Sequence, residues 1–185
     1  MSPLVSIFDI TLIVDSICQS LTLYDIQACM RVSRHWSSAF KPRVWRTVKL
    51  PSIVSLTQEK ISTILENKHW IRSLAVDVSH IEQVSGLSLT TLRGLVLYNE
   101  NFERTGDGDS VQVDAVIALI DSNGSLWSLE VDLNWYHYQS RNLSPALMFA
   151  IGRHPSLTKL TWHVPNDHIS PAFINCLLYV CHKSI

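Results

Sequence analysis

The sequence predicts a protein of the α/β (α+β) class, in which a short helical module precedes an array of alternating strands and helices. Apolar residues in the first part recur at spacings of three and four, which is typical of helices. From Trp45 onward a short apolar template recurs five times, with helical stretches between most of its copies. At 185 residues the chain has room for a small module and one medium domain, which we expect to span residues 1–45 and 46–185.

Composition and charge exclude several classes of protein. Apolar residues make up 46% of the chain and charged residues 17%, against roughly 25% charged in an average soluble protein, so most of the chain should fold. A net charge of -1 disfavours binding to nucleic acid or to a membrane surface through an overall positive field. We therefore expect neither as a partner.

Features of the two ends predict where the protein resides. The longest apolar run near the carboxyl end, residues 169–180, is too short to span a bilayer. The start, Met1-Ser2-Pro3, lacks the basic segment of a secretion signal. The cysteines show no CxxC spacing, which is typical of reduced thiols in an intracellular protein. We therefore expect a cytoplasmic or nuclear location.

The first 45 residues predict three short helices. The first should run from about Thr11 to Ser20 and the second from Asp25 to Met30. Ser33 can cap a third helix, which we expect Pro42 to end. So small a unit cannot enclose a full core, and it carries no disulfide or metal pattern, so it should dock on a partner.

The repeated template predicts a solenoid with a parallel sheet. Its five copies are Trp45-x-x-Val48-x-Leu50, Ile71-x-x-Leu74-x-Val76, Leu92-x-x-Leu95-x-Leu97, Leu126-x-x-Leu129-x-Val131 and Leu157-x-x-Leu160-x-Trp162. Their spacing is close to that of leucine-rich repeats, although irregular. Helices are expected over residues 55–67, 111–121, 144–152 and 170–181, whereas residues 81–91 look too short and too rich in glycine and serine for a full helix.

A doubly wound α/β sheet is the alternative, because it too alternates strands and helices. That fold usually places a glycine-rich phosphate turn after its first strand, and the sequence has none. The repeat reading requires each strand and its helix to bury their apolar sides against the neighbouring unit.

The helical segment resembles the F-box motif over about 40 residues. The matching pieces are Phe8-Asp9-Ile10-Thr11-Leu12-Ile13, Leu21-x-x-x-Asp25-Ile26, Cys29-x-x-Val32-Ser33-Arg34-x-Trp36 and Pro42-Arg43-Val44-Trp45-Arg46. An F-box followed by irregular leucine-rich repeats is similar to substrate receptors of cullin-RING (SCF) ubiquitin ligases, most of all the fungal ones. The family usually has Leu-Pro and an acidic residue where this chain has Ile10-Thr11-Leu12, so we expect a weaker first helix.

The resemblance implies a role in the ubiquitin conjugation pathway, with a Skp-type adaptor and a cullin scaffold as partners. Seven apolar positions would bind the adaptor: Ile10, Ile13, Ile17, Leu21, Ile26, Val32 and Trp36. In the alternative reading, the chain is a leucine-rich-repeat scaffold and the F-box-like segment is only its amino-terminal cap. Some of these side chains would then pack against the first repeat through Trp45.

Catalysis, metal and cofactor binding are not expected. The eight histidines form no HxxxH pair and have no cysteine at ligand spacing. The sequence also lacks the strained turn that exposes a nucleophilic serine or cysteine. We therefore expect a non-enzymatic adaptor whose partners carry the catalysis.

The expected sheet offers a surface for a protein substrate. Residues that alternate with the template positions should point outward, and aromatic and arginine side chains dominate many interfaces. The candidate substrate-binding residues are Arg72, Arg93, Tyr98, Trp127, Glu130, Asp132, Trp135, Tyr136, Lys159 and His163. We expect this face to begin basic and to turn acidic at the fourth strand.

The carboxyl end resembles the start of another repeat. Residues 181–185 have the character of residues 153–157, which precede the fifth strand, so Ile185 would open a sixth unit. Solenoids usually finish with a polar capping unit, whereas residues 173–180 are apolar on more than one side. We therefore expect the chain to end within its repeat array.

Overall fold

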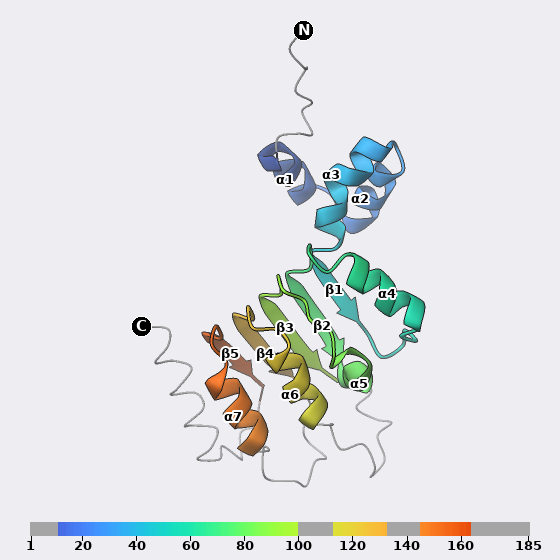
Figure 1. Ribbon diagram of the computed structural model, residues 1–185. Helices are drawn as coiled ribbons and strands as arrows, with labels where there is room; N and C mark the ends of the chain where they lie inside the picture. The colour runs from blue at the N-terminus through green and yellow to red at the C-terminus, as the bar shows by residue number, and fades with distance from the viewer. Residues whose placement is uncertain (1–10, 100–112, 133–144, 164–185) are drawn as a thin grey trace. The chain divides into compact units, whose positions relative to one another are not determined.

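In the computed structural model, residues 11–99, 113–132 and 145–163 are described (Figure 1). They form a mixed α/β protein, as the composition and pattern predict. The chain divides into two units, Met1–Thr47 and Val48–Ile185, close to the expected boundary after residue 45. Among the described residues, no helix has the length and hydropathy needed to cross a bilayer.

The described elements follow the chain in a regular alternation after the first three helices. The helices are α1 (Thr11–Gln19), α2 (Leu23–Met30), α3 (Arg34–Val44), α4 (Gln58–Glu66), α5 (Ile81–Val84), α6 (Val113–Asp121) and α7 (Pro145–Arg153), with a 3-10 helix η2 (Val78–His80). The strands are β1 (Thr47–Leu50), β2 (Ser73–Asp77), β3 (Gly94–Tyr98), β4 (Ser128–Asp132) and β5 (Lys159–Trp162). The expected helix over residues 170–181 and the expected sixth repeat lie outside the described residues.

Three helices make up the described part of the first unit, and each contributes one buried side chain to its core. Val14 of α1, Ile26 of α2 and Phe40 of α3 form this core. An ion pair between Asp15 and Arg43 links α1 to α3. Burial, together with the nearby positive charge of Arg46, lowers the pKa of Arg43.

Helix α2 begins two residues earlier than predicted because a capping box forms before Asp25. The Thr22 side chain accepts a hydrogen bond from the backbone N–H of Asp25 (3.2 Å), and the Asp25 carboxylate accepts one from the backbone N–H of Thr22 (3.0 Å). Two of the N–H groups that a helix start leaves unpaired are thereby satisfied. The hydrogen bonds from the Thr22 hydroxyl and backbone also lower the pKa of Asp25.

Helix α3 confirms the predicted cap but not the predicted end. Ser33 accepts a hydrogen bond from the backbone N–H of Trp36 (3.2 Å), as expected of an N-cap serine. The helix continues through Pro42, and the backbone N–H of Trp45 still bonds to the carbonyl of Lys41 (3.2 Å). The prediction that Pro42 ends the helix is wrong, because a proline so near the end removes only one of the last hydrogen bonds.

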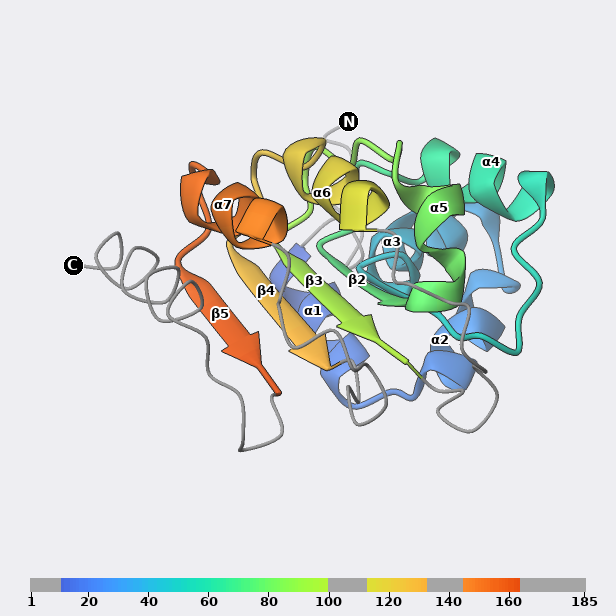
Figure 2. The same cartoon turned by 90° about the horizontal axis from the view of Figure 1, so that it is seen from below.

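The second unit is built on a sheet whose described strands follow chain order, β1-β2-β3-β4-β5. Strands β2 to β5 pair in parallel. Helices α4, α5, α6 and α7 all lie on one side of this sheet (Figure 2). A doubly wound sheet reverses its strand order and carries helices on both faces, so that alternative is excluded.

The strand register matches the template that repeats in the sequence. Leu74 pairs with Leu95, Leu95 with Leu129 and Leu129 with Leu160, so the middle positions form one continuous row. The first template positions of β2 to β5 are fully buried: Ile71, Leu92, Leu126 and Leu157. The core of this unit is therefore a stripe beneath its helices, and each strand buries its apolar side against its neighbours.

The connection between β2 and β3 contains only short helices, as predicted for residues 81–91. Helix α5 has four residues and follows the 3-10 helix η2. Asp77 caps η2 by accepting hydrogen bonds from the backbone N–H (3.0 Å) and hydroxyl (2.6 Å) of Ser79. Asp77 alternates with the template residue Val76, so the sequence pattern predicts that it points outward. This prediction is wrong, because Asp77 is fully buried.

Gly94, at the start of β3, has no structural requirement for glycine. Its φ lies outside the left-handed region, and an added Cβ would lie 3.5 Å from Ser73 Oγ, an ordinary contact. Glycine within a strand costs roughly 0.5–1 kcal/mol relative to alanine. We therefore predict that Gly94→Ala raises the free energy of unfolding by about 0.5 kcal/mol in urea denaturation. A loss of stability would show that the neighbouring strand cannot accommodate the methyl group.

Candidate functional site

The seven predicted adaptor-binding residues have different environments in the first unit. Ile26 is 7% exposed and belongs to the core, so it stabilises the unit, and the prediction that it offers a binding surface is wrong. Leu21 and Trp36 are partly buried against the same core, and Ile13 is also partly buried. Val32 is 65% exposed, whereas Ile17 is at the border of exposure at 36%. Ile10 lies outside the described residues.

Trp36 contributes to folding as well as to the surface. Its ring centroid lies 5.8 Å from that of the buried Phe40, with the rings tilted by 44°. Tilted aromatic pairs at this separation are favourable beyond the area that they bury. A substitution of Trp36 would therefore alter the core of the unit and its surface together.

Two exposed apolar residues on α2 were not among the predicted ones. Leu23 is 57% exposed and Tyr24 is 80% exposed. They occupy the first turn of α2, after the cap at Thr22, while Ile26 turns inward. The capping box Thr22-x-x-Asp25 was the signal that could have placed the helix start correctly and so revealed them. We name Ile17, Leu23, Tyr24 and Val32 together the module surface.

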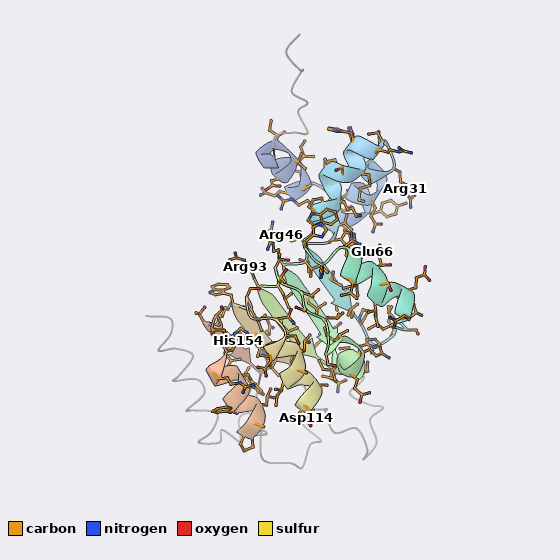
Figure 3. All side chains as sticks on the ribbon, in the orientation of Figure 1. Arg31, Arg46, Glu66, Arg93, Asp114 and His154 are labelled. Carbon is orange, nitrogen blue, oxygen red and sulfur yellow. The ribbon has the colours of Figure 1, made fainter. Side chains whose placement is uncertain are left out.

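In the second unit, four predicted substrate-binding residues lie at the amino ends of successive strands. Backbone hydrogen bonds join them in a row: Arg93 N–H to the Arg72 carbonyl (2.8 Å), Trp127 N–H to the Arg93 carbonyl (2.8 Å) and Lys159 N–H to the Trp127 carbonyl (3.1 Å). All four side chains are exposed, and Arg93 is labelled in Figure 3. We name Arg72, Arg93, Trp127 and Lys159 the amino row. Lys159 pairs with Ser128, so it lies one residue further along its strand than the other three.

The acidic predicted residues lie further along the strands. Asp132 pairs with Tyr98 across β3 and β4, and the Glu130 carboxylate lies 3.3 Å from Nε2 of His163. The Lys49 ammonium lies 5.0 Å from the centroid of the Tyr98 ring, within the range of a cation–π contact. These residues are partly or largely exposed.

The structure adds a second direction to the expected distribution of charge on the sheet. The sequence predicts a face that begins basic and turns acidic at the fourth strand. Arg72, Arg93 and Lys159 also lie at the starts of their strands, whereas Glu130 and Asp132 lie further along β4. The change in sign thus runs along the strands as well. The predicted residues Trp135 and Tyr136 lie outside the described part of the chain.

Buried polar residues between repeats were missed by sequence reasoning. Asn123 is fully buried after α6, and its amide donates to the carbonyls of Leu87 (2.9 Å) and Leu119 (2.7 Å). Its side-chain oxygen accepts from the backbone N–H of Leu89 (2.8 Å). Nε2 of the buried His154 lies 3.2 Å from the Asn123 carbonyl, which can only accept a hydrogen bond, so this nitrogen carries the proton.

These residues recur at one place in the repeat, which is the signal that could have identified them. Asn67, Asn123 and His154 each follow a helix and precede the buried first template residue by three or four positions. Buried polar groups need hydrogen-bond partners. Asn123 and His154 find theirs partly in the neighbouring repeat and so join the two, whereas the Asn67 amide donates to the carbonyl of Thr63 in its own helix.

The described residues show no arrangement suited to metal chemistry. Within residues 11–99, 113–132 and 145–163, no group of three or more histidine, cysteine, aspartate or glutamate side chains is placed to hold a metal ion. Cys18 and Cys29 are partly buried thiols in this part of the chain. Burial and the neighbouring Cys29 raise the pKa of Cys18, which disfavours the reactive thiolate.

In comparisons with known proteins, no family model and no curated protein matched the chain.

Proposed function

We propose that the chain is a substrate-recognition subunit of an SCF-type ubiquitin ligase. Its first unit would act as an F-box that binds a Skp-type adaptor, and through it a cullin scaffold. Its second unit would act as a leucine-rich-repeat domain that holds a protein substrate. In this proposal the chain is not an enzyme and works in the cytoplasm or the nucleus.

The observation that carries the proposal is the module surface. Ile17, Leu23, Tyr24 and Val32 expose large apolar side chains on a unit whose described core consists of Val14, Ile26 and Phe40. Small helical units with so little core usually gain stability from a partner. The sequential sheet with one-sided helices supports the repeat half of the proposal, because it resembles the stacking of strand and helix units.

A leucine-rich-repeat scaffold with a helical cap is the second candidate. It is favoured by Ile10-Thr11-Leu12, which departs from the motif that the F-box family carries before its first helix, and by the first turn of α1, which has no acidic residue. In that case the module surface would have no adaptor to bind. The two candidates differ in one measurable property, capture of a Skp-type adaptor.

We predict that the purified chain captures a Skp-type adaptor in a pull-down and that Tyr24→Ala with Val32→Ala weakens capture at least tenfold. Both side chains are exposed, so the double variant should keep its circular dichroism spectrum. Phe149→Ala is the matched control, because Phe149 is equally exposed but lies on α7 of the second unit. Failure of the folded wild-type chain to bind the adaptor would favour the second candidate, a leucine-rich-repeat scaffold with a helical cap.

A further inference from the structure

The amino row combines three cations and an exposed indole along one edge of the sheet. We infer that it binds a short acidic segment of a partner protein. The inference rests on the proposed function, since it names the chemical class of the substrate that the second unit would hold. Neighbouring strands lie about 4.8 Å apart, so the backbone hydrogen bonds of the row bring its cationic groups within reach of one segment.

The spacing suits an extended acidic chain. Alternate residues of an extended segment lie roughly 6.8 Å apart and point to the same side. An arginine side chain is long enough to follow this spacing and can hold a carboxylate through two parallel hydrogen bonds. Arg72 and Arg93 would bind two carboxylates in this way, and Lys159 would add positive charge one residue further along its strand.

The cations of the row are available for such a partner. Among the residues that the structure describes, neither Arg93 nor Lys159 forms an ion pair, and Arg72 donates only a long hydrogen bond (3.3 Å) to the carbonyl of Thr91. The carboxylates on the same sheet are displaced along β4: Glu130 lies three residues beyond Trp127, roughly 10 Å at the rise of a strand. Arg72 and Arg93 are thus separated from these carboxylates. Glu130 is closer to Lys159, because it lies only two residues beyond Ser128, the register partner of Lys159, on the same face.

Trp127 distinguishes the row from an ordinary solvated charge run. It is 52% exposed and lies between Arg93 and Lys159 in the hydrogen-bonded order of the row. Tryptophan and arginine are the residues most enriched among those that dominate binding energy at protein interfaces. The indole would cover an apolar side chain of the partner while Arg93, its neighbour in the row, holds a carboxylate.

The charge distribution favours an acidic peptide over a nucleic acid. A single strand bound along a groove needs a long positive track and several stacking aromatics. Here Glu130 and Asp132 lie further along the same sheet, and the net charge of the chain is -1. A short segment that is acidic at the amino row and neutral or basic toward Glu130 is complementary in charge to both parts of the sheet.

The test measures the fluorescence anisotropy of a fluorescein-labelled peptide, Gly-Asp-Leu-Glu-Asp-Leu-Glu-Gly, as the full chain is added. It is carried out at about 20 mM salt, where charges are weakly screened, and at about 150 mM salt, where screening is physiological. We expect the peptide to bind at least tenfold more tightly than its Asn/Gln analogue and more weakly at the higher salt. Arg72→Glu with Arg93→Glu should abolish this preference for the acidic peptide, and the milder Arg93→Gln should reduce it. Lys60→Glu, a charge reversal at an exposed position of α4 in the same unit, is the matched control and should leave the preference for the acidic peptide unchanged.

Three results would overturn the inference. They are equal binding of the acidic and amide peptides, unchanged binding by the folded double arginine variant, and tighter arginine-dependent binding of a fluorescein-labelled single-stranded oligonucleotide. Adaptor capture reports separately on the first unit. Peptide binding without adaptor capture would support this inference and overturn the ligase proposal. Adaptor capture without peptide binding would overturn this inference and support the ligase proposal.

Discussion

Replacing Asn123 with alanine is expected to lower the free energy of unfolding of the second unit by about 3–4 kcal/mol. The substitution removes three hydrogen bonds from a fully buried site and leaves the N–H of Leu89 and the carbonyls of Leu87 and Leu119 without that partner. An orphaned buried polar group costs roughly 1–3 kcal/mol. Thermal denaturation followed by circular dichroism should show a midpoint lower by about 10 °C.

Asn67 provides a matched control in the same unit. It is also buried after a helix, but its amide donates a single hydrogen bond, to the carbonyl of Thr63 (2.7 Å), and its side-chain oxygen has no partner among the described residues. Asn67→Ala should therefore cost only about 1 kcal/mol. Similar losses for the two variants would show that Asn123 does not join neighbouring repeats through its side chain.

The repeat register could be predicted from the sequence because a single rule governs it. Each strand buries one side, and a shift by one residue would expose every buried side chain, so the leucines must align. The predicted parallel sheet is present, and Leu74 pairs with Leu95 and Leu95 with Leu129, so the copies of the template lie in register. The short connection between β2 and β3 could be predicted for a similarly local reason, the absence of enough helix-forming residues.

Helix ends and buried polar residues were harder to predict because tertiary context decides them. The start of α2 depends on two hydrogen bonds between Thr22 and Asp25, and α3 tolerates Pro42 because it lies near the last turn. Asp77 follows the outward alternation of β2, yet capping of η2 buries it. Alternation alone does not distinguish an exposed carboxylate from one whose hydrogen bonds are satisfied inside.

The candidate surfaces were predicted only in part. The residues of the amino row were predicted one by one, but their common edge follows from the parallel pairing of β2 to β5. On the first unit, apolar periodicity could not separate Ile26, which packs inward, from Val32, which is exposed. When a helix is apolar on two sides, the sequence pattern does not show which side packs into the core and which side can bind a partner.

Replacing Phe40 with alanine is expected to unfold the first unit while the second unit stays folded. Phe40 is 1% exposed, and its described core partners are Val14 and Ile26. Truncating a buried phenylalanine costs roughly 3–5 kcal/mol, whereas a unit of this size has a total stability on the order of 2–7 kcal/mol. The second unit buries its own leucines between strands and helices, so its stability should not depend on Phe40.

Hydrogen exchange followed by mass spectrometry distinguishes the two units in the Phe40→Ala chain. Amides of α2 and α3 should lose their protection, because a unit that has lost its packing opens freely, while amides of β2 and β3 should exchange as slowly as in the wild-type chain. Tyr24→Ala removes an aromatic ring of similar size from an exposed position of the same unit, and it should leave both sets of amides protected. Retained protection of α2 and α3 in Phe40→Ala would mean that contacts other than this core hold the three helices together.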